Sequence, residues 1–475
     1  MTSPLIWIVL PAVYASILFI VRRWERTVAI LGILISLLLA WFAWVAPIGE
    51  TMVVGPWRAN LDDTLTILGR RFVLDAADAP VLTLIYLGLA FWFGGSMIAN
   101  TGNLFVPIGL ANAALLTAAI AVQPFLYSAL LIELVTIISI PLISPPNKPV
   151  ERGTLRFLTF QTLAMPLILF TGWILTGVES GPPDSVFVVH GNILLALGFA
   201  FLLAIFPFHT WVTMLAEETH PYVGAFIFYT FSLVITFFGI SFLERYAWLR
   251  TSTGLYDLLR VVGILMVALA GFWVAFQKHL GRMLGYAVLM ETGLSLLILS
   301  AGTAGEHLPA SLGILFASIL PRGLAFAVWA LALSTLMGSG NESNTPALSL
   351  HLGAVQGRGR KLPVTVVVLV AAMFSLAGFP LLAGFPVRLA LWEIVAKQSS
   401  LAGLVALLGG VGLLTSGLRT LGILISGADE EPWLVKESRG ELVLMILGGL
   451  GLLLVGVFPQ WFLPALANLA DIFFG

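Results

Sequence analysis

Long apolar stretches separated by short polar turns follow one another along the whole chain. Most of them reach the roughly 20 residues that a helix needs to cross the hydrocarbon core of a bilayer. The pattern therefore predicts an all-α polytopic membrane protein with about fourteen transmembrane helices. The expected spans cover residues 4–21, 27–47, 80–99, 103–123, 125–144, 157–177, 187–206, 221–243, 257–276, 283–301, 309–336, 362–397, 400–426 and 440–458.

The seventh and twelfth of these spans are interrupted by proline. Pro207 ends the seventh span, and Pro380 and Pro386 divide the twelfth. Proline removes a helix hydrogen bond, and a bilayer tolerates unpaired backbone groups only where protein or a water-filled cavity satisfies them. Broken helices of this kind are typical of ion or substrate paths.

Composition narrows the chemistry that this chain can carry. Only 10% of its 475 residues are charged and the net charge is -1, so neither a nucleic acid nor a strongly charged soluble partner is indicated. The chain has no cysteine, which excludes disulfides, thiolate-bound iron–sulfur clusters and cysteine nucleophiles. We predict no cofactor and no metal, so any redox chemistry belongs to another chain.

The distribution of cations predicts the orientation in the membrane. With the N-terminus outside, the inner loops hold thirteen of the 23 Lys and Arg residues and the outer loops hold seven. Because cytoplasmic loops carry an excess of cations, both termini are expected on the outer side of the cell membrane. Arg322, Arg388 and Arg419 lie inside apolar stretches instead.

Polar features recur at an offset of five spans. The fifth and tenth spans each carry one carboxylate, Glu133 and Glu291, and the breaks fall in the seventh and twelfth spans. This offset predicts two repeats of five helices, which are inverted relative to each other because five is odd. We expect an N-terminal three-helix segment with an external loop (1–99), two five-helix repeats (100–245 and 255–426) and a C-terminal helix with an amphipathic tail (427–475).

The rare ionisable groups inside the spans are the candidate site. An ionised side chain at the bilayer centre costs about 2.5–3.5 kcal/mol on insertion scales, so intramembrane carboxylates indicate function by default. Glu133, Glu291 and His209 are therefore proton-path candidates, with a structural hydrogen bond as the alternative for each. Arginine keeps its proton, so Arg322 and Arg388 are expected to be fixed counter-charges that either set a carboxylate's pKa or lock helices together.

At these residues the chain resembles the antiporter-like membrane subunits of respiratory complex I and their relatives in multi-subunit sodium/proton antiporters and membrane hydrogenases. Residues 198–211, GFAFLLAIFPFHTW, resemble the family's broken-helix motif, and residues 281–293, GRMLGYAVLMETG, resemble its KRLLAYSSISHMG stretch. Residues 362–388 resemble the twelfth-helix motif. Glu133 lies where the family carries its fifth-helix glutamate.

The resemblance implies two inverted five-helix repeats and a chain of buried charges through the membrane midplane. This sequence departs from the family at the positions where the family carries the lysines and histidines of its proton relay. The seventh-helix lysine corresponds to Leu202, the eighth-helix lysine or histidine to Phe228 or Ser232, the tenth-helix histidine to Glu291, and the eleventh- and twelfth-helix lysines to Arg322 and Arg388. A lysine relay of the family type therefore cannot operate here unchanged.

The function implied is an antiporter-like subunit of a NADH:quinone oxidoreductase-like complex that translocates protons or sodium. Such a subunit has no redox centre of its own, contacts other membrane subunits and the lipid bilayer, and in this chain has a degenerate proton path. Two alternatives stay open, a stand-alone proton or cation transporter and a non-conducting structural or coupling subunit.

Overall fold

Helices dominate the fold, as the apolar pattern predicts. The computed structural model describes residues 2–46, 48–49, 51–54, 57–144, 149–175, 186–302, 308–338, 349–426 and 435–470. Within these ranges ten helices are long and apolar enough to cross a membrane, and four further apolar helices are shorter. The prediction of an all-α polytopic membrane protein is confirmed. The number of fourteen spans, the inverted repeats and the four predicted domain boundaries stay predictions.

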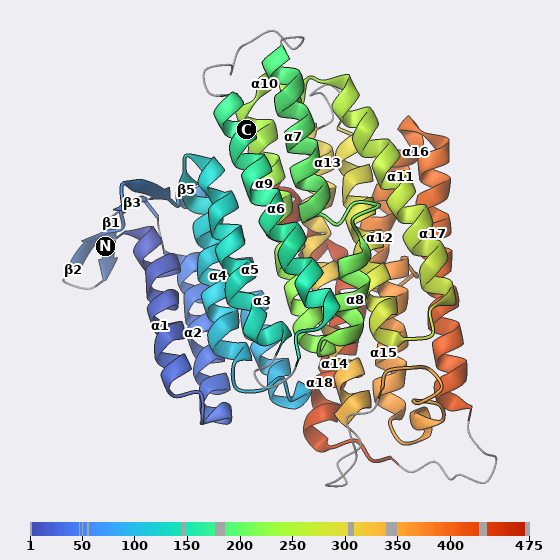
Figure 1. Ribbon diagram of the computed structural model, residues 1–475. Helices are drawn as coiled ribbons and strands as arrows, with labels where there is room; N and C mark the ends of the chain where they lie inside the picture. The colour runs from blue at the N-terminus through green and yellow to red at the C-terminus, as the bar shows by residue number, and fades with distance from the viewer. Residues whose placement is uncertain are drawn as a thin grey trace. The chain divides into compact units, whose positions relative to one another are not determined.

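The chain divides into two compact units. The first contains residues 1–97, 101–203 and 231–250 (Figure 1). Its helices are η1 (Leu5–Val9, a π-helix), α1 (Leu10–Ile20), α2 (Glu25–Val45), η2 (Ala76–Asp78), α3 (Ala79–Ala99), α4 (Phe105–Ala121), η3 (Phe125–Tyr127), α5 (Ser128–Ile143), α6 (Arg152–Ile174), α7 (Val186–Leu202), the later part of α9 (Pro221–Arg245) and α10 (Ala247–Arg250).

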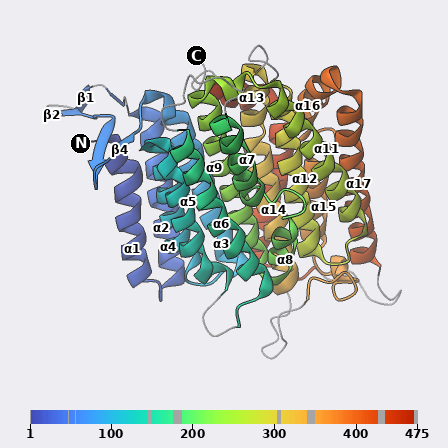
Figure 2. The same cartoon turned by 45° about the horizontal axis from the view of Figure 1, so that its top comes forward.

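The polar loop predicted after the second span forms strands. β1 (Thr51–Val54) pairs with β2 (Trp57–Asn60), and β3 (Thr64–Ile67) pairs with β4 (Arg70–Val73), both antiparallel. β5 (Val122–Gln123) extends the second hairpin by pairing with β4. Figure 2 shows β1, β2 and β4 beyond the ends of α1 and α2, on the side of the N-terminus.

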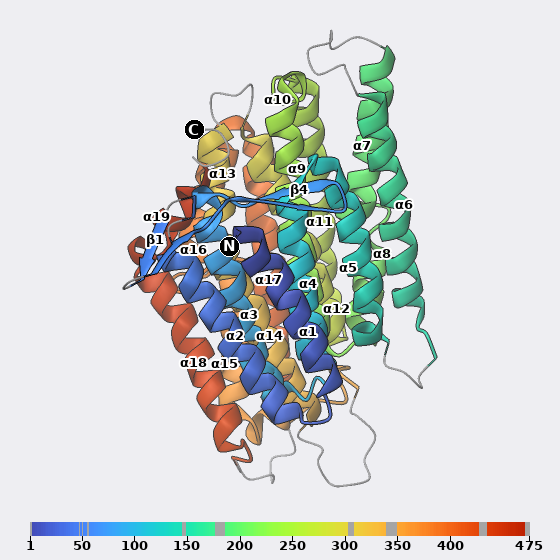
Figure 3. The ribbon, with the colours of Figure 1, turned by 90° about the vertical axis from the view of Figure 1, so that its left-hand side faces the viewer.

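The second unit contains residues 98–100, 204–230 and 251–475. Figure 3 shows α18 running along the outside of this unit next to α15, on which it packs. Its elements are α8 (Thr210–Glu218), the start of α9, α11 (Thr253–Phe276), α12 (Leu280–Ser300), α13 (Leu308–Ala317), α14 (Ile319–Gly338), η5 (Arg358–Arg360), α15 (Pro363–Ala377), α16 (Phe385–Gln398), α17 (Ser400–Ile425), α18 (Arg439–Val457), η6 (Pro459–Trp461) and α19 (Leu463–Ala467).

The polar connection between α14 and α15 is partly described. Residues 339–348 lie outside the described residues. After them, His351 forms an antiparallel bridge with His279, and the carbonyl of Leu350 accepts from the N–H of Leu280 at 2.9 Å. This part of the connection is therefore anchored to the turn between α11 and α12.

Both interruptions identified in the sequence are non-helical. α7 ends at Leu202, and residues 203–209, which include Pro207, lead to α8. α15 ends at Ala377, where Gly378 takes φ +84° and closes the last turn by donating to the carbonyl of Ser375 at 3.1 Å. Pro380 lies within residues 378–384, and Pro386 lies in the first turn of α16.

The centre of the second unit is formed by α12 and α14. In their most apolar windows, 89% of α12 and 78% of the α13–α14 segment is buried, against 33% of α11 and 44% of α17. A helix that is apolar all round and buried on all sides belongs to the inside of a bundle. A charged residue on α12 is therefore shielded by protein and not by lipid.

α11 and α17 cross with their backbones in contact through glycines. A Cβ on Gly412 would collide with the carbonyl group of Gly271, whereas a Cβ on Gly422 of the same helix would meet nothing within 4 Å. Close backbone approach through small residues is the usual way in which membrane helices associate. We expect Gly412→Ala to destabilise the protein by about 1–3 kcal/mol, the range for overpacking a filled site. Gly422→Ala is the matched control. Its stability against thermal unfolding in detergent should equal or slightly exceed that of the unsubstituted chain, because alanine favours helix.

Candidate charged cluster in the second unit

Three of the candidate charged residues meet in the second unit. Glu291 on α12 is 5% exposed and Arg388 on α16 is 6% exposed. The guanidinium of Arg388 forms an ion pair with Oε1 of Glu291, and Nε of Arg322 on α14 lies 2.9 Å from Oε2. One buried carboxylate therefore holds two guanidinium groups from two other helices.

Arg322 reaches the cluster from the first turn of α14, which begins only three residues earlier. Ser318 separates α13 from α14 and starts the turn that carries Arg322. Nη1 of Arg322 also donates to the hydroxyl of Ser295 at 2.9 Å. Ser295 lies one turn after Glu291 on α12, so one face of α12 provides both acceptors.

Arg388 is held by the end of the broken helix. The carbonyl of Leu376 accepts from Nε of Arg388 at 3.1 Å and from Nη2 at 2.6 Å. The last carbonyls of a helix have no partner within it and carry the negative end of the helix dipole. The interruption after α15 thus creates an acceptor for the guanidinium.

The cluster carries a net positive charge and adjoins a small cavity. Two arginines and one carboxylate sum to +1, and no second carboxylate forms an ion pair with either arginine in the described parts of the chain. The cavity measures about 20 Å³ and is lined by Glu291, both arginines and the hydroxyl-bearing Ser318 and Ser375. Because one water needs roughly 10–15 Å³ of such space, a single water fits beside the carboxylate.

Glu133 has a different environment in the first unit. It is 9% exposed on α5, and the hydroxyl of Thr162 on α6 donates to its Oε1 at 2.7 Å. Its Oε2 is buried and has no hydrogen-bond partner among the described residues. No described cation lies within ion-pair distance of Glu133, whereas Glu291 pairs with two arginines.

His209 lies in the first interruption, directly before α8. Its ring stacks on Phe206 with ring centroids 3.6 Å apart, and its Nδ1 is buried without a hydrogen-bond partner in the described part of the chain. Neither Glu133 nor Glu291 forms a described hydrogen bond or ion pair with it. The structure thus brings Glu291, Arg322 and Arg388 together and leaves Glu133 and His209 as separate sites.

The positions where the resemblance expects lysine or histidine are apolar or neutral here. Leu202 is the last residue of α7 and is buried, and Phe228 on α9 is buried against Trp211. Ser232 is half-buried, and its carbonyl accepts from the hydroxyl of Thr236 at 2.7 Å. These three positions contribute no titratable group.

A second ion pair ties α8 to the start of α12. Nη2 of Arg282 lies 2.5 Å from Oε2 of Glu217, and both side chains are partly exposed. Burial lowers the pKa of nearby His279 below its usual 6.5, although the carboxylate of Glu217 opposes this shift. Such a histidine stays neutral at pH 7. In the described ranges, no three His, Asp or Glu side chains come close enough to hold a metal ion.

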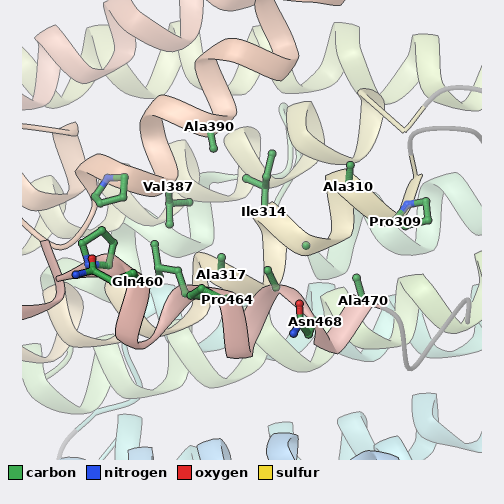
Figure 4. A pocket seen from close by; sticks show the side chains of 15 residues that line it. Pro309, Ala310, Ile314, Ala317, Val387, Ala390, Gln460, Pro464, Asn468 and Ala470 are labelled. Atoms are coloured by element: carbon green, nitrogen blue, oxygen red, sulfur yellow. The ribbon is translucent and has the colours of Figure 1, made fainter.

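A larger groove in the second unit has no ionisable lining. It measures about 590 Å³ and lies between α13, α16 and the C-terminal segment from η6 to α19 (Figure 4). Gln460 and Asn468 are polar, and the other described lining residues are proline, glycine or aliphatic. This groove cannot exchange protons, so the small cavity at Glu291 is the better candidate for chemistry.

Sequence reasoning missed the neutral partners of the charged groups. Ser295 follows Glu291 by one helical turn, so its spacing was a usable signal. The carbonyl of Leu376 was signalled only by the proline-rich break that frees it. Thr162 had no signal, because a threonine in an apolar helix is common and its partner is 29 residues away.

Comparisons with known proteins agree with the fold. The family model described as NADH:quinone oxidoreductase/Mrp antiporter, transmembrane region, matches residues 174–414. NADH-quinone oxidoreductase subunit N 2 of Acidobacterium capsulatum is 25% identical over 429 residues, which cover 82% of this chain and 84% of the relative. Subunit N of Coxiella burnetii is 24% identical over 446 residues, covering 87% and 88%.

Solved structures share the fold over nearly the whole chain. A chain of respiratory complex I from Thermus thermophilus aligns with a TM-score of 0.76 at 21% identity, covering 99% of this chain and 98% of that one. A chain of the Mrp complex from Dietzia sp. aligns with a TM-score of 0.77 at 17% identity, covering 98% and 97%. A chain of an archaeal membrane-bound sulfane sulfur reductase aligns with a TM-score of 0.79 at 16% identity, covering 99% and 97%.

Proposed function

Because this chain belongs to the NADH:quinone oxidoreductase/Mrp antiporter transmembrane family, we propose that it is an antiporter-like subunit of a redox-driven, ion-translocating membrane complex. The relatives named as subunits of NADH-quinone oxidoreductase support membership in such a complex. The electron carriers would belong to other subunits, since this chain has no cysteine for an iron–sulfur cluster.

We further propose that its proton path is degenerate. The observation that carries this proposal is the pairing of Glu291 with both Arg322 and Arg388. Both carboxylate oxygens of Glu291 are held by guanidinium groups, and arginine does not release a proton, so this cluster is poorly suited to proton exchange. Glu133, without a paired cation, and His209 are then the groups in this chain best suited to carry protons.

The distribution of cations supports an orientation with both termini on the outer side of the cell membrane. Since positive charge is retained on the cytoplasmic side, the loop with Arg358, Arg360 and Lys361 would face inward.

The orientation of this loop is tested with the variant Lys361→Cys, whose single cysteine is labelled with a membrane-impermeant maleimide. Reaction only in inside-out vesicles is expected, and reaction in right-side-out vesicles would reverse the orientation.

Glu133→Gln tests the proton path in the assembled complex. Loss of a positioned proton-transfer group slows transfer by orders of magnitude, so we expect proton pumping per electron pair to fall, by about tenfold if no other subunit compensates. Pumping is measured in inside-out vesicles and normalised to electron transfer. Glu393→Gln is the control, because Glu393 is exposed on α16 and pairs only with Lys397.

Two other outcomes would redirect the proposal. Unchanged pumping in Glu133→Gln would identify a non-conducting structural or coupling subunit. Proton or sodium movement by the purified chain alone in liposomes would identify a stand-alone transporter.

A further inference from the structure

The lengths of α15 and α16 place the interruption between them inside the hydrocarbon layer of a bilayer. α15 follows the charged turn of Arg358, Arg360 and Lys361, and its 15 residues rise about 22 Å at 1.5 Å per residue. α16 adds 14 residues beyond the interruption. Since the hydrocarbon core is about 30 Å thick, residues 378–384 fall inside it, roughly 8 Å short of the far side.

Part of this interruption faces outward. Leu381 is 64% exposed and Phe379 is 44% exposed, with exposed Pro380 between them. Leu381 takes φ +70°, a conformation that β-carbon-bearing residues rarely adopt. The backbone of residues 379–381, called here the outer break, therefore does not continue the helix on the outside of this unit.

The hydrogen-bonding groups on the inner and outer sides of the interruption differ in whether they have partners. On the inner side, Gly384 donates to the hydroxyl of Ser375 at 3.0 Å, and Arg388 donates to the carbonyl of Leu376. On the outer side, the N–H of Leu381 and the carbonyl of Pro380 have no hydrogen-bond partner among the described residues.

Two glycines of the described helices approach the interruption, and the ring of Phe374 on α15 packs on Phe379 with ring centroids 5.3 Å apart. Gly456 of α18 lies against the carbonyl of Leu381, and Gly410 of α17 lies against the carbonyl of Ala377. Glycine permits the close approach but offers no side-chain donor or acceptor. The N–H of Leu381 and the carbonyl of Pro380 are thus left without a partner among the described residues.

We propose that the outer break is an interface for a transmembrane helix of a different subunit, which carries a hydroxyl or carboxamide side chain at this depth. Lipid tails cannot hydrogen-bond, and irregular backbone within the membrane is tolerated only where protein or a water-filled cavity covers it. Hydrogen-bonding side chains on a neighbouring helix supply the missing groups. In a two-fold symmetric contact, a second copy of this chain would present the same apolar Phe379 and Leu381 and no such side chain. This inference rests on the proposed assembly with other subunits and names the surface for one of them.

The absence of cysteine from the chain makes a clean test possible. Leu381→Cys and, as a control, Leu408→Cys are each labelled with a benzophenone maleimide in the assembled complex and irradiated. Leu408 on α17 is 55% exposed and lies two residues from Gly410, so it shares the depth of the interruption. Phe379→Cys serves as a second probe of the outer break if Leu381→Cys does not assemble.

We expect the outer-break probe to crosslink to another membrane subunit, at a site within one turn of a Ser, Thr, Asn or Gln. The Leu408 probe is expected to label lipid. Lipid adducts from both positions, or a crosslink between two copies of this chain, would overturn the inference. If no other subunit co-purifies with the chain, the proposed complex membership itself fails, which is a distinguishable result.

Discussion

Replacing Glu291 with glutamine is expected to destabilise the protein more than any other single change of charge inside the second unit. The substitution leaves Arg322 and Arg388 buried without a carboxylate, and the two guanidinium groups then repel each other. Removing one partner of a buried ion pair costs about 3–5 kcal/mol, and here one carboxylate serves two partners. Thermal unfolding in detergent, followed by intrinsic fluorescence, should show a large loss of stability together with poor assembly.

Glu133→Gln is the matched control for this loss. It is the same substitution at a buried intramembrane position, but the only described partner of Glu133 is the hydroxyl of Thr162. An amide oxygen can accept that bond, so a change below about 1 kcal/mol is expected. A second control is the double variant Glu291→Gln with Arg388→Met, which should recover part of the loss because apolar replacement of buried ions is often tolerated. Equal effects of Glu291→Gln and Glu133→Gln would show that the arginines do not depend on Glu291.

Much of the fold follows from the sequence because the bilayer leaves few choices. Backbone groups in lipid must be paired within the segment, so an apolar stretch of sufficient length becomes a helix. This is why the described helices occupy the predicted stretches. Pro321 in the span 309–336 indicates a kink, and the helix is interrupted at Ser318, three residues earlier, because proline cannot donate the hydrogen bond that would continue α13.

Long-range packing was less accessible from the sequence. α8 follows α7 directly in the chain, yet it packs on α12, where Gly281 contacts the carbonyl of Ala216. One glycine in a glycine-rich membrane protein does not identify such a contact. The grouping of residues 204–230 with the second unit could therefore not be predicted from the sequence. The position of the interruption at Pro207 could be.

The candidate site divides in the same way. The rarity of charge in apolar stretches identified Glu291, Arg322 and Arg388 individually, because each is costly inside a membrane. Their meeting could not be predicted, since Arg388 is 97 residues from Glu291 and either arginine alone could have paired with it. The structure shows that both do. Whether Glu133 and His209 carry protons stays a prediction.

The shared carboxylate also explains how this chain differs from the pattern that it resembles. The resemblance implies lysine at the positions of Arg322 and Arg388, and lysine is a point charge that can give up its proton. Two arginines around one glutamate form instead a permanent lock between α12, α14 and α16. Under the proposed function, the same scaffold would keep its buried charges while losing proton exchange at this point.

Arg388→Lys is expected to return a group that can release its proton to the interruption of α15 and α16. Lysine retains a positive charge that can reach Glu291, but it lacks the planar fork with which Arg388 holds the carbonyl of Leu376 and Glu291 together. We expect a stability loss of about 1–3 kcal/mol, the range for charged hydrogen bonds, which is smaller than for Glu291→Gln. Proton pumping per electron pair in the assembled complex is expected to stay the same or to rise.

Arg388→Met separates the two roles of this residue, because it removes the charge while keeping most of the volume. If Arg388 limits proton exchange, pumping relative to electron transfer should be higher in Arg388→Lys than in Arg388→Met, and the difference should depend on pH, since lysine titrates and methionine does not. If Arg388→Lys and Arg388→Met lose assembly to the same extent, the guanidinium fork is needed for structure. Arg388 then acts as a clamp between α12 and the broken helix.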